Sequence, residues 1–371
     1  MQNIKVLHVT KTYYPEIVGG VQEAIRLASY SKQSDFQADV FCLCKDIKKL
    51  RIVRFNKSIV YQFPISFDYH STPVSLKALC KFRSIAKNYN IIHYHYPWPF
   101  IGLLNMLLIG LNKKVVMSYH ADAIGSKLLE KLNSFICLNL FSKASKIIVA
   151  SPNITLNNPY FKFNKYINKV TIMPFKLHDI VERHQSIQIS KEQPQDFVLY
   201  IGQFREYKGV NVIIDAARLL PNVKFFLVGK GRQYELIKTK IINDKIDNVY
   251  LLGVISDEQK NKLLEKSKVL ILPSITRGEA FGISLLEGMR QSKPVISTEL
   301  GTGTSYVNLD GVSGLVIEPN NSKMLADAIS KMYEDNELYK KLSIGARKRY
   351  KDYFCYQDNS EYIKLYEEVL S

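Results

Sequence analysis

The sequence contains few cysteines and no long hydrophobic run. It has 5 cysteines in 371 residues, with no C-x-x-C pair, so we expect reduced, buried thiols and neither a disulfide framework nor a zinc site. The longest apolar stretch, Ile101 to Leu111, is interrupted by Asn105 and is too short to cross a bilayer. Met1 to Thr10 has the pattern of a strand and lacks the basic and apolar segments of a signal peptide. We therefore expect a protein that is kept in the cytoplasm.

Acidic residues are scarce in the first half of the chain. Residues 1–180 carry 24 Lys or Arg against 9 Asp or Glu, whereas residues 181–371 carry 27 against 25. A surplus of +15 in one half indicates a negatively charged partner for that half. The alternative interpretation is that the surplus reflects a lysine-rich composition and no partner. Zinc-finger spacing and the aromatic motif of RNA-recognition modules are both missing, so we expect no nucleic acid partner. An anionic membrane surface or a lipid phosphate is the favoured partner.

Short β-rich runs alternate with helical stretches along the whole chain, and we find no repeat or low-complexity tract. This alternation predicts an α/β protein with parallel sheets and crossover helices, and the length suits two domains. Helices are expected over 21–31 and 76–89. The expected strands are 4–10, 38–44, 91–95, 114–120, 146–150 and 170–173 in the first half, and 197–201, 223–228, 249–252, 269–272, 294–297 and 314–317 in the second.

A polar stretch from Lys176 to Asp196 separates the two series and is predicted to be the linker. We expect a first domain over 1–176, a second over 177–352, and a helical segment over 353–371. Each domain is predicted to be a doubly wound, Rossmann-like parallel sheet. Because ligands of such sheets bind at the carboxyl ends of the strands, we expect the active site in a cleft between those ends of the two domains.

Two candidate site segments follow strands of the first domain. Gly19 and Gly20 precede a helix, where glycines let the backbone approach an anion at the helix N-terminus. A tight turn between strand and helix is the alternative interpretation. His120 ends the predicted strand 114–120, which would place it at the ligand edge of the sheet, and a hydrogen-bonded structural histidine is the alternative.

His93 and His95 also lie at a strand end. Their spacing suits a metal, but no third ligand is indicated. We therefore interpret them as part of a pocket wall and expect no bound metal.

The second domain offers two more candidates. Arg205 and Lys208 lie in the loop after its first strand, where two cations can neutralise a diphosphate. Solvated surface cations are the alternative on this spacing alone. In the second candidate, Glu279 and Gly282 precede a helix that contains Glu287. The glycine turn predicts an anion site made of backbone N–H groups, and the two carboxylates can accept hydrogen bonds from sugar and ribose hydroxyls.

Taken together, these residues resemble the family 4 retaining glycosyltransferases of the GT-B fold. Glu279 and Glu287, eight apart, match that family's E-x7-E motif, and Gly202 to Gly209 matches its arginine-and-lysine loop. Val228 to Gly231 matches its second-domain glycine turn, and Gly19-Gly20 its first-domain glycine pair. The resemblance covers essentially the whole chain. It implies a first domain that binds the acceptor, a second that binds the nucleotide-sugar donor, and a final helix that crosses back to the first domain.

The resemblance also implies roles for individual residues. Arg205 and Lys208 would hold the donor diphosphate, Glu287 the ribose and Glu279 the transferred sugar, and His120 would lie near the reacting face of that sugar. Phosphate and sugar contacts are also implied for the donor-binding positions Gly19, Gly20, Gly229, Gly282, Ile283, Ser284 and Leu285. The sequence has no D-x-D, so we expect no metal and no other cofactor. Electrostatic stabilisation of the leaving group would come from the two cations and the helix N-terminus.

Finer patterns narrow the substrate. The segments 95–100, 118–122 and 297–308 resemble a bacterial surface-polysaccharide and O-antigen subgroup, many of whose members are mannosyltransferases. This resemblance implies GDP-mannose as donor and a prenyl-diphosphate-linked saccharide as acceptor, with the enzyme peripheral on the inner face of the cytoplasmic membrane. A UDP-sugar donor, a nucleotide-sugar epimerase on the same scaffold and a protein that only binds its ligand are the alternatives.

Overall fold

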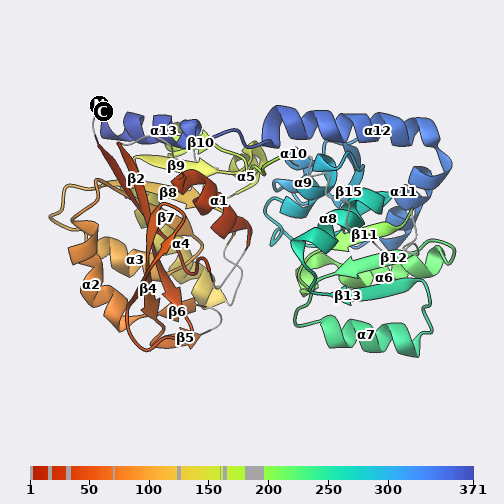
Figure 1. Ribbon diagram of the computed structural model, residues 1–371, viewed down its shortest axis with the longest axis horizontal. Coiled ribbons are helices and arrows are strands. Elements are labelled where there is room, and N and C mark those ends of the chain that lie inside the picture. Colours follow the sequence, from red (N-terminus) through yellow and green to blue (C-terminus); the bar gives the residue numbers. More distant parts are fainter. Residues whose placement is uncertain are drawn as a thin grey trace. The chain divides into compact units, whose positions relative to one another are not determined.

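A computed structural model of the chain describes residues 3–15, 19–30, 35–69, 72–122, 127–158, 160–161, 165–179 and 196–371. Residues 16–18 beside the glycine pair and most of the predicted linker, 180–195, lie outside these ranges. The chain divides into two compact units (Figure 1). Unit 1 comprises Met1–Ala150, Thr155–Phe175 and Gln357–Ser371, and unit 2 comprises Ser151–Ile154 and Lys176–Tyr356.

Unit 1 is built on a sheet in the order β10-β9-β8-β7-β1-β2-β4-β3, with β5 and β6 forming a separate pair. Neighbouring strands are parallel except for β3, which runs antiparallel to β4. The strands are β1 (Ile4–Val9), β2 (Phe36–Cys44), β3 (Arg51–Phe55), β4 (Ser58–Pro64), β5 (Phe67–Tyr69), β6 (Thr72–Val74), β7 (Ile91–Tyr96), β8 (Lys114–Tyr119), β9 (Lys146–Val149) and β10 (Val170–Ile172). The helices are α1 (Gly20–Ser29), α2 (Leu76–Ala86), α3 (Phe100–Met106), α4 (Lys127–Lys143), the 3-10 turn η1 (Ile167–Lys169) and α13 (Ser360–Leu370). Helix α5 (Pro152–Asn157) is divided between the two units, which separate after Ile154.

Unit 2 is built on a fully parallel sheet in the order β13-β12-β11-β14-β15-β16. Its strands are β11 (Val198–Ile201), β12 (Phe225–Val228), β13 (Val249–Gly253), β14 (Val269–Leu272), β15 (Val295–Thr298) and β16 (Gly314–Ile317). Its helices are η2 (Glu206–Lys208), α6 (Val210–Leu219), α7 (Tyr234–Asn243), α8 (Asp257–Lys266), α9 (Ile283–Arg290), α10 (Thr304–Val307), α11 (Ser322–Glu334), α12 (Asn336–Arg349) and the π-helical turn η3 (Tyr350–Phe354).

The apolar runs of the sequence form the buried strands of both sheets. All four residues of β14 are buried, and β1 is buried along almost its whole length. Strands covered by helices on both faces require such runs, because neither face of the sheet meets water. The structure confirms the predicted α/β class with two Rossmann-like parallel sheets. The hairpin of β3 and β4, over Arg51 to Pro64, was not predicted.

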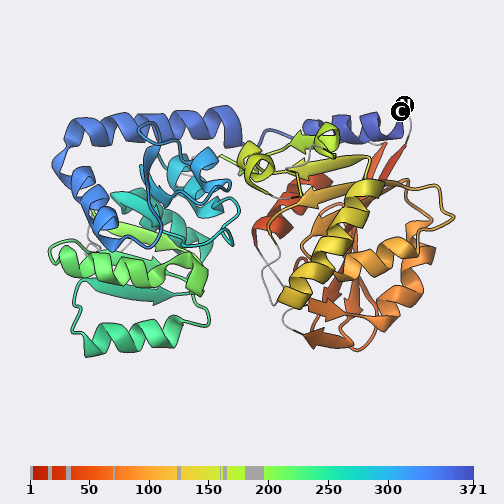
Figure 2. The same cartoon turned by 180° about the vertical axis from the view of Figure 1, so that it is seen from behind.

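The last helix, α13, belongs to unit 1 although unit 2 precedes it in the sequence. Ile363, Tyr366 and Val369 on this helix pack in the core cluster that contains Val6 of β1 and Ile91 of β7. Figure 2 shows α13 in dark blue beside the strands of unit 1. Within the described ranges, no helix combines the length and hydropathy needed to span a membrane.

Candidate functional site

The loops that carry Lys208 and Glu279 follow neighbouring strands of unit 2. β11 and β14 are paired in parallel, so both loops leave the same edge of the sheet, where ligands of such sheets bind. The ammonium of Lys208 donates a hydrogen bond to Oε2 of Glu279. Ser274 donates from Oγ to the same carboxylate oxygen over 3.1 Å. Two residues that the sequence analysis selected separately therefore form one ion pair.

The electrostatics of this pair follow from its burial. The side chains of Lys208 and Glu279 are 14% and 9% exposed. Burial by itself lowers the pKa of Lys208, but the Glu279 carboxylate more than offsets this, and the net pKa is raised above the ordinary value for lysine. Lys208 is therefore a fixed positive charge at neutral pH, placed beside a carboxylate that accepts hydrogen bonds.

Gly209 allows the two loops to approach each other. Its φ is +69°, and a Cβ atom at this position would lie 1.9 Å from the carbonyl oxygen of Pro273. The loops are also joined by the backbone N–H of Ile275, which donates to the carbonyl oxygen of Tyr207 over 2.8 Å. Since both the backbone conformation and the space exclude a side chain, glycine is required here.

Arg205 lies three residues before Lys208 and has an exposed side chain. Its positive charge acts to lower the pKa of Lys208, which shows that the two cations are close enough to influence each other. Beside them, the predicted glycine turn supports the loop. A Cβ atom on Gly229 would lie 1.9 Å from the carbonyl oxygen of Gly202, and Phe204 N–H donates to Lys230 O over 3.1 Å.

The N-terminus of α9 lies directly after Glu279. Gly282 is the N-cap residue and has a left-handed backbone conformation, with φ +86°. Ile283 and Ser284 are half-buried in the first turn, where backbone N–H groups have no acceptor within the helix. The side chain of Leu285 is fully buried, and its N–H donates to Gly282 O over 2.9 Å. The anion-binding capacity of this turn therefore resides in the backbone of Ile283 and Ser284.

Glu287 lies further along α9 and is paired with a lysine that the sequence analysis missed. Nζ of Lys260, on α8, lies 2.7 Å from Oε1 of Glu287 and 3.0 Å from Oδ1 of Asp257. Burial alone lowers the pKa of Lys260, but these carboxylates raise it, Glu287 first, so that the net pKa is above the ordinary value. One carboxylate oxygen of Glu287 is thus held by Lys260, which fixes the direction of the side chain.

In unit 1, Gly19 and Gly20 lie at the start of α1, as their position before a helical pattern predicted. Gly20 is the first helical residue, and Gly19 is the N-cap residue in an extended conformation. The first turn of α1 contains Glu23, which accepts hydrogen bonds from Arg26 and, over 3.0 Å, from Tyr14. The charge of Glu23 is therefore paired with that of Arg26 on the same helix.

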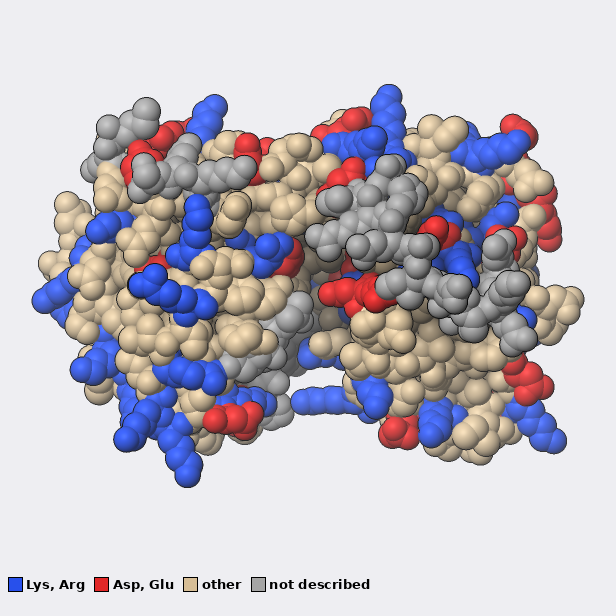
Figure 3. Space-filling view, in the orientation of Figure 1, with Lys and Arg blue, Asp and Glu red and all other residues tan. Residues whose placement is uncertain are grey.

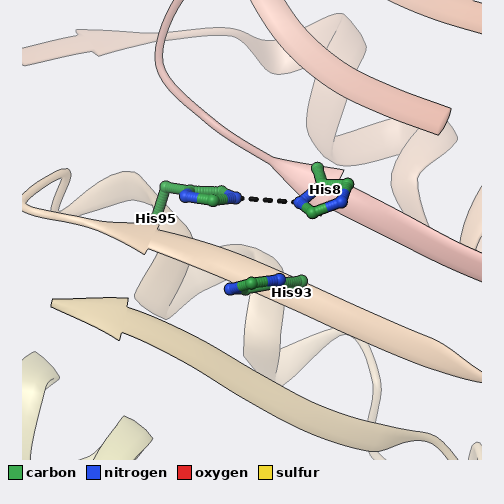
Figure 4. Close-up of side chains that lie close together, drawn as sticks. All are labelled: His8, His93 and His95. Atoms are coloured by element: carbon green, nitrogen blue, oxygen red, sulfur yellow. Dashed lines mark hydrogen bonds between the residues drawn. The ribbon is translucent and has the colours of Figure 1, made fainter. Parts of the chain in front are cut away.

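His120 follows β8 directly and is the outermost of a group of imidazoles. Its Nε2 lies 2.8 Å from Nδ1 of His95, and its ring stacks on that of Phe175. Nε2 of His95 in turn lies 3.0 Å from Nδ1 of His8 (Figure 4). The sequence pattern indicated no third ligand beside His93 and His95, and the position of His8 corrects this. It was missed because His8 meets them through the pairing of β1 with β7, which sequence spacing does not reveal.

The three histidines His8, His93 and His95 are also the group whose ring nitrogens best suit a metal ion among the described residues. These nitrogens lie within 4.8 Å of one another, compared with about 3.3 Å for ligands around tetrahedral zinc. Both nitrogens of His93 are hydrogen-bonded, to Tyr366 and Ser118, each over 2.8 Å. A metal bound to either nitrogen of His93 would have to displace one of these partners, so the group fits a hydrogen-bonded cluster better.

Comparison with known proteins places these residues in a family context. Residues 18–155 match the family model described as Glycosyltransferase Family 4, and residues 182–349 match that described as Glycosyl transferases group 1. The O-antigen chain mannosyltransferase C of Escherichia coli is 35% identical over 374 residues, covering 99% of each chain. The D-rhamnosyltransferase WbpZ of Pseudomonas aeruginosa is 32% identical over 356 residues, covering 95% of this chain and 92% of its own.

A solved structure resembles the whole fold. The sucrose-phosphate synthase of Thermosynechococcus elongatus has a TM-score of 0.77 at 18% sequence identity, with 99% of each chain covered. At this identity the likeness concerns the fold alone.

Proposed function

Because the chain belongs to glycosyltransferase family 4 and has the GT-B fold, we propose that it transfers mannose from GDP-mannose to a saccharide carried on a lipid diphosphate. The proposed setting is bacterial surface-polysaccharide synthesis. The similarity to an O-antigen mannosyltransferase over the full chain supports both the sugar and the setting. The similar identity to a D-rhamnosyltransferase makes D-rhamnose the competing donor sugar.

The ion pair of Lys208 and Glu279 carries the proposal. The ammonium of Lys208 and the exposed guanidinium of Arg205 lie on the loop after β11. The first-turn N–H groups of α9 follow the loop after β14, at the same edge of the unit 2 sheet. Positive groups fixed in this way stabilise the negative charge that develops on a departing diphosphate. The adjacent carboxylate of Glu279 accepts hydrogen bonds from hydroxyls of the transferred sugar, and Glu287 accepts them from the ribose.

The proposed reaction retains the configuration at the anomeric carbon. The bond between that carbon and the diphosphate oxygen breaks, and the acceptor hydroxyl oxygen bonds to the carbon from the same face. The hydroxyl proton passes to the departing phosphate oxygen, so nucleoside diphosphate and glycoside are the products. No protein nucleophile takes part, and His120 contacts the sugar near its reacting face. Arg205, Lys208 and the N-terminus of α9 take the role that a metal has in metal-dependent transferases.

An association of unit 1 with anionic membranes belongs to the same proposal. Exposed lysines and arginines gather on unit 1, on the left of Figure 3. Helix α3 packs against α2 and α4. α2 carries exposed basic side chains, and apolar side chains are exposed on α3 and α4 and just after α3, namely Leu103, Met106, Ile109, Phe135 and Leu138. Apolar side chains beside basic ones suit insertion at a lipid headgroup surface.

A transfer assay with matched donors tests the proposed reaction. The enzyme is incubated with GDP-mannose or UDP-glucose and a prenyl-diphosphate-linked saccharide, in buffer containing a chelator, and the product linkage is determined by NMR. The proposal expects transfer from GDP-mannose with an α-linked product. Transfer from UDP-glucose alone would replace the donor, and an inverted linkage would overturn the retaining mechanism. Conversion of the donor without an acceptor would favour an epimerase.

Vesicle sedimentation tests the membrane association separately. Binding to vesicles with anionic lipid, but not to neutral vesicles, is the expected result. Phe135→Asp should weaken this binding while leaving donor binding unchanged. Equal binding of the variant and the unsubstituted enzyme would exclude α4 as the membrane-facing element.

A further inference from the structure

Three imidazoles form a hydrogen-bonded chain inside unit 1. Nδ1 of His8 lies 3.0 Å from Nε2 of His95, and Nδ1 of His95 lies 2.8 Å from Nε2 of His120. The rings of His95 and His120 are nearly parallel, with an interplanar angle of 6° and centroids 5.1 Å apart. His8 and His95 are buried, and His120 is half-buried just beyond the end of β8. The chain of imidazoles therefore leads from the interior of the sheet to its carboxyl edge. Figure 4 shows its inner contact, between His8 on β1 and His95 on β7.

Burial keeps these imidazoles neutral. It lowers the pKa of His8 to about 3 and that of His120 to about 4. Burial first, and then the neighbouring imidazoles, lowers the pKa of His95 well below its ordinary value. A neutral imidazole has one N–H and one bare nitrogen. Each of the two contacts between rings needs one proton between its two nitrogens. Two arrangements satisfy both contacts: all three rings carry their proton on Nδ1, or all three carry it on Nε2.

The inner end of the chain decides between these arrangements. Nε2 of His8 is buried and has no hydrogen-bond partner within the described part of the chain. Protons on Nε2 would leave a buried N–H without an acceptor at this point, whereas protons on Nδ1 leave a bare nitrogen there. Buried N–H groups without a partner are rarer in native structures than acceptors without one. The arrangement with all protons on Nδ1 is therefore favoured, and it places an N–H at the outer end of the chain, on His120.

We propose that His8 and His95 are positioning residues that hold His120 as a neutral hydrogen-bond donor, with its Nδ1–H directed to an oxygen of the transferred sugar. The identity of this ligand rests on the function proposed above. Glycosyl transfer passes through a state with positive charge at the anomeric carbon. A neutral donor can orient the sugar there without adding a repelling charge, which an imidazolium would do.

Nitrogen-15 NMR of the ligand-free protein tests the arrangement directly. Ring nitrogens with and without a proton resonate in separate regions, and the signals are assigned through single histidine substitutions. The proposal expects His8, His95 and His120 to carry their protons on Nδ1 at neutral pH. A proton on Nε2 of His95 or His120, or a doubly protonated ring, would overturn it. Because this measurement needs no substrate, its failure is distinct from a failure of the proposed function, which would appear as a lack of donor binding.

Two substitutions at His95 test the effect on activity. His95→Asn places an amide N–H where Nδ1–H stood, so it keeps a donor for Nε2 of His120, whereas His95→Phe keeps a ring and removes the donor. His95→Phe should lower kcat/KM for the donor about tenfold, the scale of one hydrogen bond. His120 should also lose its uniform Nδ1–H signal in this variant. His95→Asn should restore both properties. Equal loss of activity in both variants, with the His120 signal unchanged, would show a purely structural role and overturn the proposal.

His93 provides the matched control. It is equally buried and its ring stacks on that of His95, but its two nitrogens are hydrogen-bonded to Tyr366 and Ser118 and not to the three imidazoles. Phe at this position keeps a stacking ring and removes only those two hydrogen bonds. His93→Phe should leave the proton of His120 on Nδ1. A shift of that proton to Nε2 in this variant would contradict the independence of the chain and overturn its assignment.

Discussion

The ammonium of Lys208 is bonded to the carboxylate of Glu279, 71 residues later in the chain. This pair joins the loop after β11 to the loop after β14, and Ser274 supports it from the second loop. Both charges are mostly withdrawn from water, so each depends on the other. The proposed function uses both partners, one for the leaving diphosphate and one for the sugar.

Removal of one partner should therefore affect both stability and activity. Lys208→Ala and Glu279→Ala should each lower transfer about a hundredfold, the scale of losing one fixed electrostatic group. Each should also lower the free energy of unfolding by about 3 kcal/mol, because the remaining charge is left buried without its partner. Urea titration and transfer assays measure the two effects.

The exposed pair of Lys262 and Glu258 on α8, 2.7 Å apart, is the control for this experiment. Glu258→Gln should change the free energy of unfolding by no more than about 0.5 kcal/mol. Near-normal turnover of Lys208→Ala or Glu279→Ala would remove that residue from the proposed site.

Gly209→Ala should distort the donor loop. The substitution adds a Cβ atom that would lie 1.9 Å from the carbonyl oxygen of Pro273, at a residue with φ +69°. The loop must shift to relieve the clash, so nucleotide affinity and thermal stability should both fall. Gly311→Ala is a close control, because Gly311 has φ +68° and nothing within 4 Å of its added Cβ. It should show only the cost of the left-handed backbone, about 1 kcal/mol. Equal effects of the two substitutions would show that the clash is unimportant.

Glu287→Gln should weaken nucleotide binding. The carboxylate is proposed to accept from the ribose, and hydrogen bonds to charged groups contribute about 1.5–3 kcal/mol, so the Kd should rise at least about tenfold. Lys260→Met should also weaken binding, because Lys260 fixes one oxygen of Glu287. Asp257→Asn, which changes only the exposed partner of Lys260, should leave the Kd unchanged. Calorimetric titration with the nucleoside diphosphate measures all three, and an unchanged Kd for Glu287→Gln would remove it from the ribose site.

The buried His8 should make the fold sensitive to acid. Burial lowers its pKa from 6.5 to about 3 in the folded chain. Below pH 6.5 the unfolded chain therefore binds a proton that the folded chain does not, so stability falls as the pH decreases. The expected slope is about 1.4 kcal/mol per pH unit for this group, and it vanishes above pH 6.5.

Replacing His8 with Phe should flatten the slope of unfolding free energy against pH between pH 6 and 4 by this amount, as measured by urea titration. An unchanged slope in the His8 variant would contradict the burial argument.

The sequence predicted the buried strands well because a strand covered on both faces must be apolar along its length. The hairpin of β3 and β4 was missed because β3 lies at the sheet edge, where Arg51 and Arg54 are exposed and interrupt the apolar pattern. The order of the strands in each sheet could not be predicted from the sequence pattern, because a parallel neighbour can lie far away in the chain.

The same limit applies to the site. The loops of Lys208 and Glu279 could be predicted from residue types at strand ends, but their ion pair depends on β11 lying beside β14. His8 joins His95 only because β1 lies beside β7, and Lys260 reaches Glu287 only because α8 packs near α9. Each of these partners is an ordinary residue in its own segment and becomes informative only through the fold.

Thermal unfolding with nucleotides, in a buffer without metal, is the decisive test of the proposed donor site. A ligand present at a hundred times its Kd stabilises the folded state by about 2.7 kcal/mol, which such a measurement detects readily. GDP and GDP-mannose should raise the Tm of the enzyme, UDP and ADP compounds should not, and Lys208→Ala should lose the shift. A shift with UDP compounds alone would keep a glycosyltransferase with another donor. No shift with any nucleotide or nucleotide sugar would contradict a donor site built on Lys208, Glu279 and the N-terminus of α9.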